Sequence, residues 1–398
     1  MKRRDFLNLS AATGLSLSLS TSPVFAATEA KTLYDPTRYL FIADKTTYYI
    51  TVFDIMTGEA IELLNFNIKP QVMEMARDDA MLALGNPEVS DLYLYNLRNR
   101  ETKIVPLPSP LYQVFFVPQS KLLAVGLRDQ VGIVNYETGE VKIFPEKFDS
   151  SKRQTVLYAY YTLLFSSFSQ SFWVLDKEKP KIYRKYGYDP IEKPWDTIDF
   201  TGRIKTSSGL DTGVSSPEDF MVAFTTLDGS EGLVYFPQND KLLTTGPMYQ
   251  VGTTYRPLNM PYIDAYSKRV LFADVSGSVA IFDFNAGDEK PMRFNVDFSP
   301  RIFRTGWLES TWILGGDKGL LFQSFDNPED KKIYRFPYEV VDMWVTGDSK
   351  TLLMTVDEGP PQVLRFDIRS KEMLDPMPIR GVVMGGKLRM GSNNSICY

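Results

Sequence analysis

The chain has 398 residues, of which 43% are hydrophobic and 23% charged, a composition typical of a globular protein with a substantial core. Its formal charge is −5, so it has no general electrostatic attraction for nucleic acid or anionic lipid. The sequence contains no histidine and one cysteine, Cys397. These absences exclude Ser-His-Asp and Cys-His catalysis, histidine-ligated metal sites, an intramolecular disulfide and iron–sulfur clusters.

The first residues carry the pattern of an export signal. Four of them match the motif R-R-x-F-L and resemble a twin-arginine (Tat) signal: Arg3, Arg4, Phe6 and Leu7. A weakly apolar stretch follows, and Ala26 occupies the position before a signal-peptidase cleavage site. We therefore expect residues 1–26 to be a cleavable Tat-type signal peptide and the mature protein to be periplasmic or otherwise exported. A Sec signal is the alternative, because Lys2 and Asn8 depart from the Tat pattern.

A repeat of about 42 residues sets the expected fold. Each unit contains a short apolar strand, a turn with Asp or Asn, an alternating strand, a polar turn and a further strand; clear copies begin at 39–44, 122–127 and 270–273. The equivalent point in successive units falls at Asp54, Asn96, Asn135, Asp176, Phe236, Asp283, Phe325 and Asp367. The apolar pattern has period two, and no sustained helical period follows the signal. Short strands in such units describe a β-propeller.

Eight units predict an all-β, eight-bladed β-propeller that forms a single domain over residues 27–398. A seven-bladed ring is the alternative, if the irregular fifth unit is not a full blade. The first unit lacks its innermost strand, whereas the strand-like piece 380–390 belongs to no unit. We expect this piece to supply the missing strand, so that the N- and C-terminal strands pair and close the ring without free edges. The longer spacing after the fourth point predicts an insertion at about residues 186–220.

The turns at 56–59 (Met-Thr-Gly-Glu) and 137–140 (Glu-Thr-Gly-Glu) resemble those of quinoprotein and YVTN-type bacterial β-propellers. The quinoprotein alcohol dehydrogenases of that group place tryptophans at set blade positions and carry an adjacent cysteine pair. Here the five tryptophans recur at no common position, so we expect no pyrroloquinoline quinone and no other cofactor. Amine dehydrogenases with a comparable propeller keep catalysis in a separate small subunit, which implies that a propeller can be a non-catalytic subunit.

Three other patterns have simple structural interpretations. Residues 381–387 fit seven positions of a phosphate-binding loop, but Leu388 stands where Ser or Thr must follow, so a glycine-rich closing strand is expected. The uncharged stretch 156–175 has a serine-rich middle, which favours two buried strands over a membrane span. Acidic residues recur after the first strand of many units, at Asp44, Asp129, Asp228, Asp274, Asp317 and Asp357. We expect them to form tight turns and no metal site.

Irregular segments at 186–220, 244–262 and 298–304 are expected to be loops that gather aromatic and arginine side chains. Such residues dominate binding hot spots, and loops on a rigid scaffold often carry function. The predicted binding patch consists of Tyr188, Trp195, Arg203, Tyr249, Tyr255, Arg256, Arg301 and Arg304. The alternative is that these rings fold back and cap the fifth blade.

These observations predict an exported, non-catalytic propeller that acts as a binding or scaffolding subunit for another periplasmic protein, such as a redox enzyme. Two alternatives stay open. One is a quinoprotein-like dehydrogenase that uses carboxylates and arginines around the central channel, and the other is a small-molecule or sugar binder that uses Trp195 and neighbouring tyrosines. The channel lining distinguishes them, because apolar plugging favours the scaffold and converging charge favours the enzyme.

Overall fold

The structure is a computed structural model that describes residues 38–44, 46–76, 80–148, 159–205, 208–229, 231–248, 261–264, 268–287, 289–308, 310–357, 361–379 and 385–390. The chain divides into two units, Met1–Thr32 and Leu33–Tyr398, and every described residue lies in the second unit. Cys397 and the residues of the predicted signal, Arg3, Arg4, Phe6, Leu7 and Ala26, lie outside the described residues.

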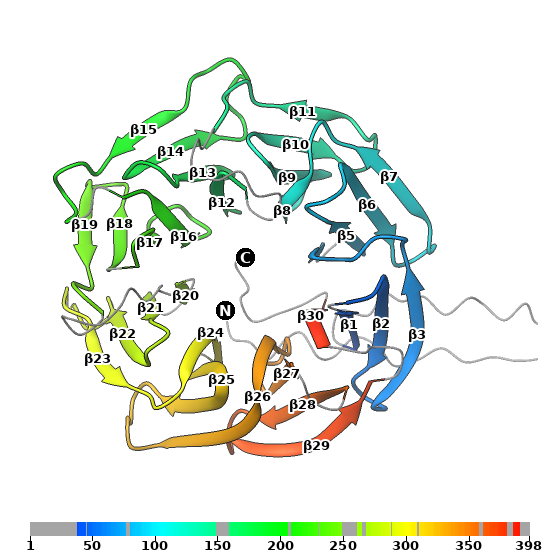
Figure 1. Ribbon diagram of the computed structural model, residues 1–398, viewed down its shortest axis with the longest axis vertical. Helices are drawn as coiled ribbons and strands as arrows, with labels where there is room; N and C mark the ends of the chain where they lie inside the picture. Colours follow the sequence, from blue (N-terminus) through cyan, green and yellow to red (C-terminus); the bar gives the residue numbers. More distant parts are fainter. Residues whose placement is uncertain are drawn as a thin grey trace, which may run out of the picture. The chain divides into compact units, whose positions relative to one another are not determined.

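The described residues form strands β1 to β30 and no helix, arranged as sheets around a ring (Figure 1). Six sheets have four strands each, which follow one another from the centre of the ring to its rim. From centre to rim, the first sheet contains β30 (Gly385–Met390), β1 (Tyr39–Asp44), β2 (Tyr49–Asp54) and β3 (Glu59–Asn65), and the second contains β4 (Val72–Met75), β5 (Met81–Gly85), β6 (Asp91–Asn96) and β7 (Thr102–Pro106). The third sheet contains β8 (Leu111–Phe116), β9 (Leu122–Leu127), β10 (Val131–Asn135) and β11 (Val141–Ile143), and the fourth contains β12 (Tyr161–Ser166), β13 (Ser171–Asp176), β14 (Lys181–Tyr186) and β15 (Asp196–Asp199). The fifth sheet contains β16 (Leu210–Ser215), β17 (Val222–Thr226), β18 (Gly232–Phe236) and β19 (Lys241–Thr244), and the sixth contains β20 (Tyr262–Asp264), β21 (Arg269–Ala273), β22 (Ser278–Asp283) and β23 (Met292–Asn295).

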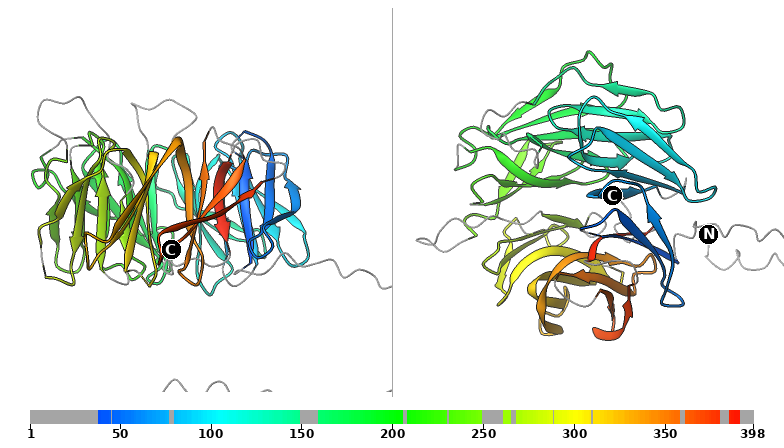
Figure 2. Two further views of the ribbon diagram at one scale, coloured as in Figure 1. Left: turned by 90° about the horizontal axis from the view of Figure 1, so that it is seen from below. Right: turned by 45° about the vertical axis from the view of Figure 1, so that its right-hand side comes forward.

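The seventh sheet has six strands: β24 (Ser299–Gly306), β25 (Thr311–Ser324), β26 (Lys331–Val345), β27 (Thr351–Val356), β28 (Gln362–Asp367) and β29 (Glu372–Pro378). The strands run between the two faces of the ring (Figure 2). No helix in the described part of the chain is long and apolar enough to cross a membrane. The uncharged stretch 156–175 instead contributes to the antiparallel pair β12 and β13, as expected.

The ring has seven sheets, which matches the seven-bladed alternative and corrects the expectation of eight blades. The fifth unit is nevertheless a complete sheet, β16 to β19. The number falls because β26 pairs with β25 along residues 331–339 and with β27 along residues 340–345. No glycine interrupts β26, and its one proline, Pro337, is absent from both ladders, so one unbroken strand joins the last two repeat units.

Pairing of the first and last described strands closes the ring, as predicted. In the antiparallel ladder between β1 and β30, Leu40 lies opposite Met390 and Ile42 opposite Leu388. All four side chains are buried in a cluster with Trp344 and other apolar residues of the last sheet. The C-terminal strand therefore covers the inner edge of β1, which would otherwise be free to pair with another chain.

The core lies between neighbouring sheets. Phe41 on β1, for example, packs in one cluster with Met73 on β4 and Leu84 on β5. Because both faces of a sheet are covered, central strands such as β9 (Leu-Leu-Ala-Val-Gly-Leu) are apolar almost throughout instead of alternating.

Polar turns explain the sequence repeat. Asp54 Oδ1 accepts the Met56 amide at 3.0 Å, and Asn135 Oδ1 accepts the Glu137 amide at 3.0 Å. Gly58 has φ +74°, a left-handed conformation in which other residues are strained. Two of the acidic residues predicted to form turns behave in the same way, since the carboxylates of Asp44 and Asp274 accept amides two residues further on: Thr46 and Ser276.

One repeat marker was placed wrongly. Asp176 ends β13, the second strand of its sheet, whereas the markers in the other four-stranded sheets end the third strand, which here ends at Tyr186. Asp176 accepts the Glu178 amide at 2.8 Å, so both kinds of turn carry the same signal. Residues 186–220 are accordingly not one insertion loop, because they contain β15 and β16.

Candidate functional site

A chain of alternating charges crosses four neighbouring strands at the inner edge of the ring. Arg389 on β30 lies with Nε 3.3 Å from Glu74 Oε2 on β4 and with Nη1 3.3 Å from Asp342 Oδ2 on β26. Asp342 Oδ1 lies 3.4 Å from Arg304 Nη2 on β24. Together with Lys387, these residues make up the channel cluster.

Asp342 is the centre of the cluster and its acceptor positions are occupied. Oδ1 also accepts the Met343 amide at 2.8 Å, and Oδ2 accepts the Leu388 amide at 3.0 Å. The side chain is only 12% exposed. A carboxylate with this many donors holds the neighbouring strands and arginines in place.

The two arginines are fixed by further contacts. Arg304 Nε donates to the Met343 carbonyl at 2.8 Å, and its burial lowers its pKa. The Arg389 guanidinium lies 5.3 Å from the centre of the Trp344 ring. Burial opposes the charge of Arg389 as well, but Glu74 and Asp342 outweigh it and raise the Arg389 pKa. Both guanidiniums are therefore held as preorganised cations.

Lys387 belongs to the same cluster but has no ion pair among the described residues. It lies two positions before Arg389 on β30, and side chains two apart share a face of a strand. Its side chain is exposed, yet desolvation by the surrounding protein and repulsion from Arg389 lower its pKa despite the attraction of Asp342 and Glu74. A side chain such as Lys387 can be exposed to water in the channel and still be desolvated by the protein groups around it.

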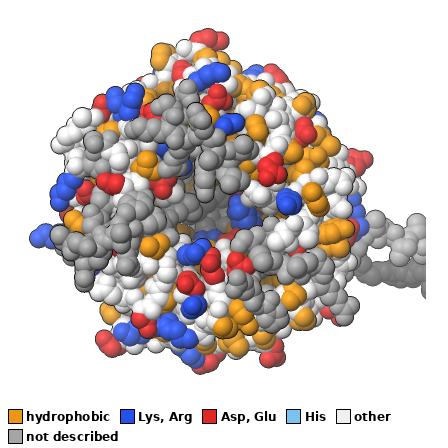
Figure 3. All heavy atoms as spheres, viewed as in Figure 1, with side chains coloured by type: hydrophobic (Ala, Val, Ile, Leu, Met, Phe, Trp, Pro, Cys, Tyr) orange, Lys and Arg blue, Asp and Glu red, His pale blue; other side chains and the backbone are white. Residues whose placement is uncertain are grey.

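The channel cluster therefore carries three cationic groups against two carboxylates, in a chain whose formal charge is −5. Viewed down the ring, the surface is hollowed at its centre, with basic and acidic side chains around the hollow (Figure 3). The described lining thus shows converging charge instead of an apolar plug. An anion would meet a local excess of positive charge there.

The described members of the predicted binding patch are spread over several elements. Trp195 is 7% exposed and its indole nitrogen donates to Glu146 Oε2 at 3.0 Å. Its ring packs edge-on against Phe144 and Phe148. The expectation that Trp195 faces a ligand was wrong, because these aromatic neighbours bury it.

Other members of that patch lie beside different elements. Tyr188 is 71% exposed and follows β14, and Arg203 Nη1 lies 2.8 Å from Asp240 Oδ1 beyond β18. Arg301 pairs with Glu339. Three further members lie outside the described residues: Tyr249, Tyr255 and Arg256.

Arg304 is the one predicted residue that belongs to the channel cluster. The segment 298–304 was expected to be a loop, but it forms most of strand β24, so Arg304 lies in the channel wall. Sequence reasoning missed Glu74, Asp342, Lys387 and Arg389. The available signal was a charge within an otherwise apolar strand, as in Val72-Met73-Glu74-Met75.

No protein-family model and no curated protein matches this sequence. Solved structures do share its fold. The structure of the dihydro-heme d1 dehydrogenase NirN in complex with DHE aligns with a TM-score of 0.67 over 90% of this chain and 76% of that chain, at 14% identity. Apo AztD from Citrobacter koseri aligns with a TM-score of 0.57 over 88% of this chain and 96% of that chain, at 10% identity. This chain is an all-β β-propeller. At such identities the likeness concerns the fold alone.

Proposed function

We propose that this chain is an exported, non-catalytic binding protein whose central channel holds a small ligand with several carboxylates. The observation that supports it is Lys387, a desolvated cation beside Arg389 without an ion pair among the described residues. A carboxylate of the ligand would relieve this unfavourable position, and further carboxylates would meet the guanidinium groups of Arg304 and Arg389.

Converging charge in the channel was expected to favour an enzyme, but the contacts in the cluster favour binding. Asp342 accepts from two backbone amides and two arginines, and Glu74 accepts from Arg389. Both carboxylates are therefore engaged by groups of the protein itself. The chemistry that remains is electrostatic recognition of an anion.

Export is part of the proposal and rests on the resemblance of the N-terminal sequence to a Tat signal. It requires that the mature chain appear in the periplasmic fraction. Export should be lost when Arg3 and Arg4 are both replaced by lysine; export that persists would instead support the Sec alternative.

The structural likeness to NirN suggests one ligand class to test. NirN is named for dihydro-heme d1, and haem-type macrocycles carry several carboxylates. This sequence has no histidine to ligate iron, and the proposal rests on the carboxylates of such a ligand and on the channel wall.

Isothermal titration calorimetry with citrate, mesoporphyrin and mesoporphyrin dimethyl ester tests the proposal. Citrate or mesoporphyrin should bind, the neutral ester should bind less well than mesoporphyrin, and Lys387→Met should weaken binding by about tenfold or more. Lys142→Met is the matched control, because Lys142 lies on the outer strand β11 and is 56% exposed. Equal affinity of both variants, or no binding of either anion, would contradict the proposal.

The same titration has a predicted pH dependence. Since the pKa of Lys387 is lowered in the free protein, a bound anion should raise it again, and binding should be coupled to proton uptake. Affinity should fall as the pH rises through the lowered pKa. This additional pH dependence should be absent in Lys387→Met.

A further inference from the structure

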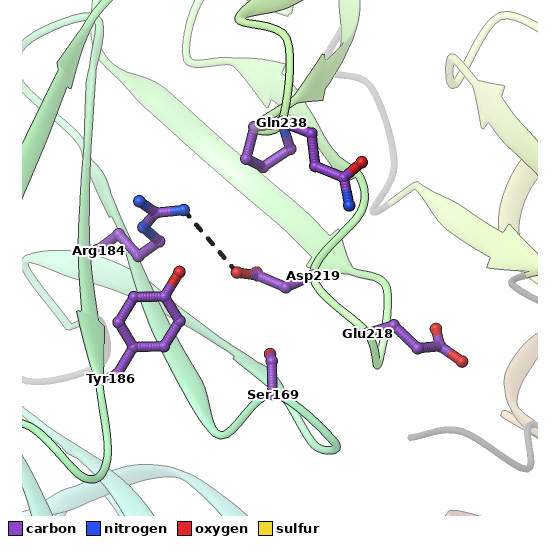
Figure 4. A pocket seen from close by; sticks show the side chains of 7 residues that line it. Ser169, Arg184, Tyr186, Glu218, Asp219 and Gln238 are labelled. Atoms are coloured by element: carbon purple, nitrogen blue, oxygen red, sulfur yellow. Dashed lines mark ion pairs between the residues drawn. The ribbon is translucent and has the colours of Figure 1, made fainter.

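A pocket lies between the sheets β12–β15 and β16–β19 and shares no residue with the channel cluster. Its volume is about 230 Å³, and it is lined by Ser169, Arg184, Tyr186, Glu218, Asp219, Pro237 and Gln238 (Figure 4). Pockets for drug-sized ligands start at about 300 Å³, so this one has room for a ligand of about one ring.

The charged walls of the pocket are held in place by the core. The Arg184 guanidinium lies 5.2 Å from the ring centres of both Trp173 and Tyr186. Asp219 accepts from the Trp173 indole at 2.6 Å and from Ser171 Oγ at 3.1 Å. Arg184 Nη1 and Asp219 Oδ2 are 3.9 Å apart (Figure 4). A ligand would therefore meet groups that need little further ordering.

Two exposed aromatic rings belong to the turns beside the pocket. Tyr188 is 71% exposed and stacks on Tyr186, with centroids 5.1 Å apart and an angle of 17°. Phe168, next to Ser169, is 57% exposed. The two turns are joined because the Gly187 amide donates to the Gln170 carbonyl at 2.7 Å. Rigid exposed rings offer flat contact area at a low entropic cost.

The mixture of charges selects the ligand class. Arg184 and Asp219 offset each other as an ion pair and Glu218 is exposed to solvent, so the described lining of the pocket holds no unpaired buried charge that would attract an ionic ligand. A neutral ligand with several hydroxyl groups can donate to the carboxylates and accept from Arg184 and the Gln238 amide at once. The C–H groups of a sugar ring also suit the electron-rich face of an aromatic ring.

We propose that this pocket binds one neutral sugar ring, with Arg184, Glu218 and Gln238 contacting its hydroxyl groups and the ring of Tyr188, which stacks on the lining residue Tyr186, contacting its C–H groups at the rim. The site shares Tyr188 with the predicted patch but does not use Trp195, which is buried. It is also independent of the channel ligand.

Saturation-transfer NMR with the methyl glycosides of glucose, galactose and mannose tests this site in the full-length chain. At least one glycoside should receive saturation from the wild-type protein. The signal should fall by about threefold or more in Tyr188→Ala and in Gln238→Ala. It should be unchanged in Tyr48→Ala, a tyrosine that is 46% exposed and precedes β2, and in Lys387→Met.

Three outcomes would overturn the proposal: no saturation of any of the three glycosides, an undiminished signal in both pocket variants, or stronger binding of glucosamine or glucuronate than of methyl glucoside. Circular dichroism of each variant identifies a loss of signal that comes from misfolding. Because Lys387→Met leaves this pocket intact, failure here and failure of the channel proposal are separate results.

Discussion

The ion pair between Arg38 and Asp54 shows how one residue links the repeat to stability. Asp54 is 1% exposed, and Arg38 Nη2 lies 2.5 Å from its Oδ2. The hydrogen bond from Arg38 lowers the pKa of Asp54, although burial opposes this, and the Met56 and Thr57 amides lower it further. The marker that reveals the repeat in the sequence therefore also stabilises the turn.

Asp54→Asn should lower the free energy of unfolding by about 1.5–3 kcal/mol at pH 7, because a charged hydrogen bond is lost from a buried site. A carboxyl group whose pKa is lowered on folding contributes stability above its unfolded pKa of 3.8 and loses it as the pH falls through the folded value. The difference between wild type and variant should thus shrink in acid. Urea unfolding between pH 3 and pH 7 measures it, and a difference that does not change with pH would contradict the assigned cause.

The amino-acid type of a single residue did not show whether that residue can bind a ligand. Trp195 and Tyr188 were equally attractive as binding residues, but Trp195 is buried by Phe144 and Phe148 whereas Tyr188 is exposed. Burial depends on packing between strands far apart in the sequence, which local pattern does not contain.

Among the strands, β30 has the clearest structural role, because it completes the first sheet. Leu388 is fully buried between β1 and the last sheet. Leu388→Ala should therefore lower the free energy of unfolding by about 2–5 kcal/mol.

Leu63 on β3 is 45% exposed and provides the matched control, for which a change within about 0.5 kcal/mol is expected. Guanidinium unfolding of both variants makes the comparison. Equal effects would show that β30 is not packed as described.

Strand positions were largely predictable because apolar runs and polar turns alternate along the chain. The predicted segments 39–44 and 122–127 coincide with β1 and β9, and the segment 270–273 lies within β21. The long strand β26 was not predictable, since Pro337 favours a break in a strand whereas β26 continues through it. Asp176 was misassigned for the opposite reason, because the turn after β13 has the same hydrogen bond as the turns at the repeat markers.

For the whole molecule, closure of the ring creates the candidate site. Arg389 and Glu74 are 315 residues apart in sequence, and they meet because β30 lies between β26 and β4 at the inner edge of the ring. The sequence predicted this closure but not its consequence. The order of the sheets, and the strand face on which each side chain lies, decide which charged residues line the channel together.

Diffraction from crystals soaked in bromide, which scatters anomalously, tests the proposed anion site most directly. We predict an anomalous peak in contact with Lys387 Nζ in wild-type crystals, and no such peak in Lys387→Met crystals treated in the same way. A Lys387 ammonium paired with a carboxylate of its own chain, with no anion in the channel, would contradict the proposed function.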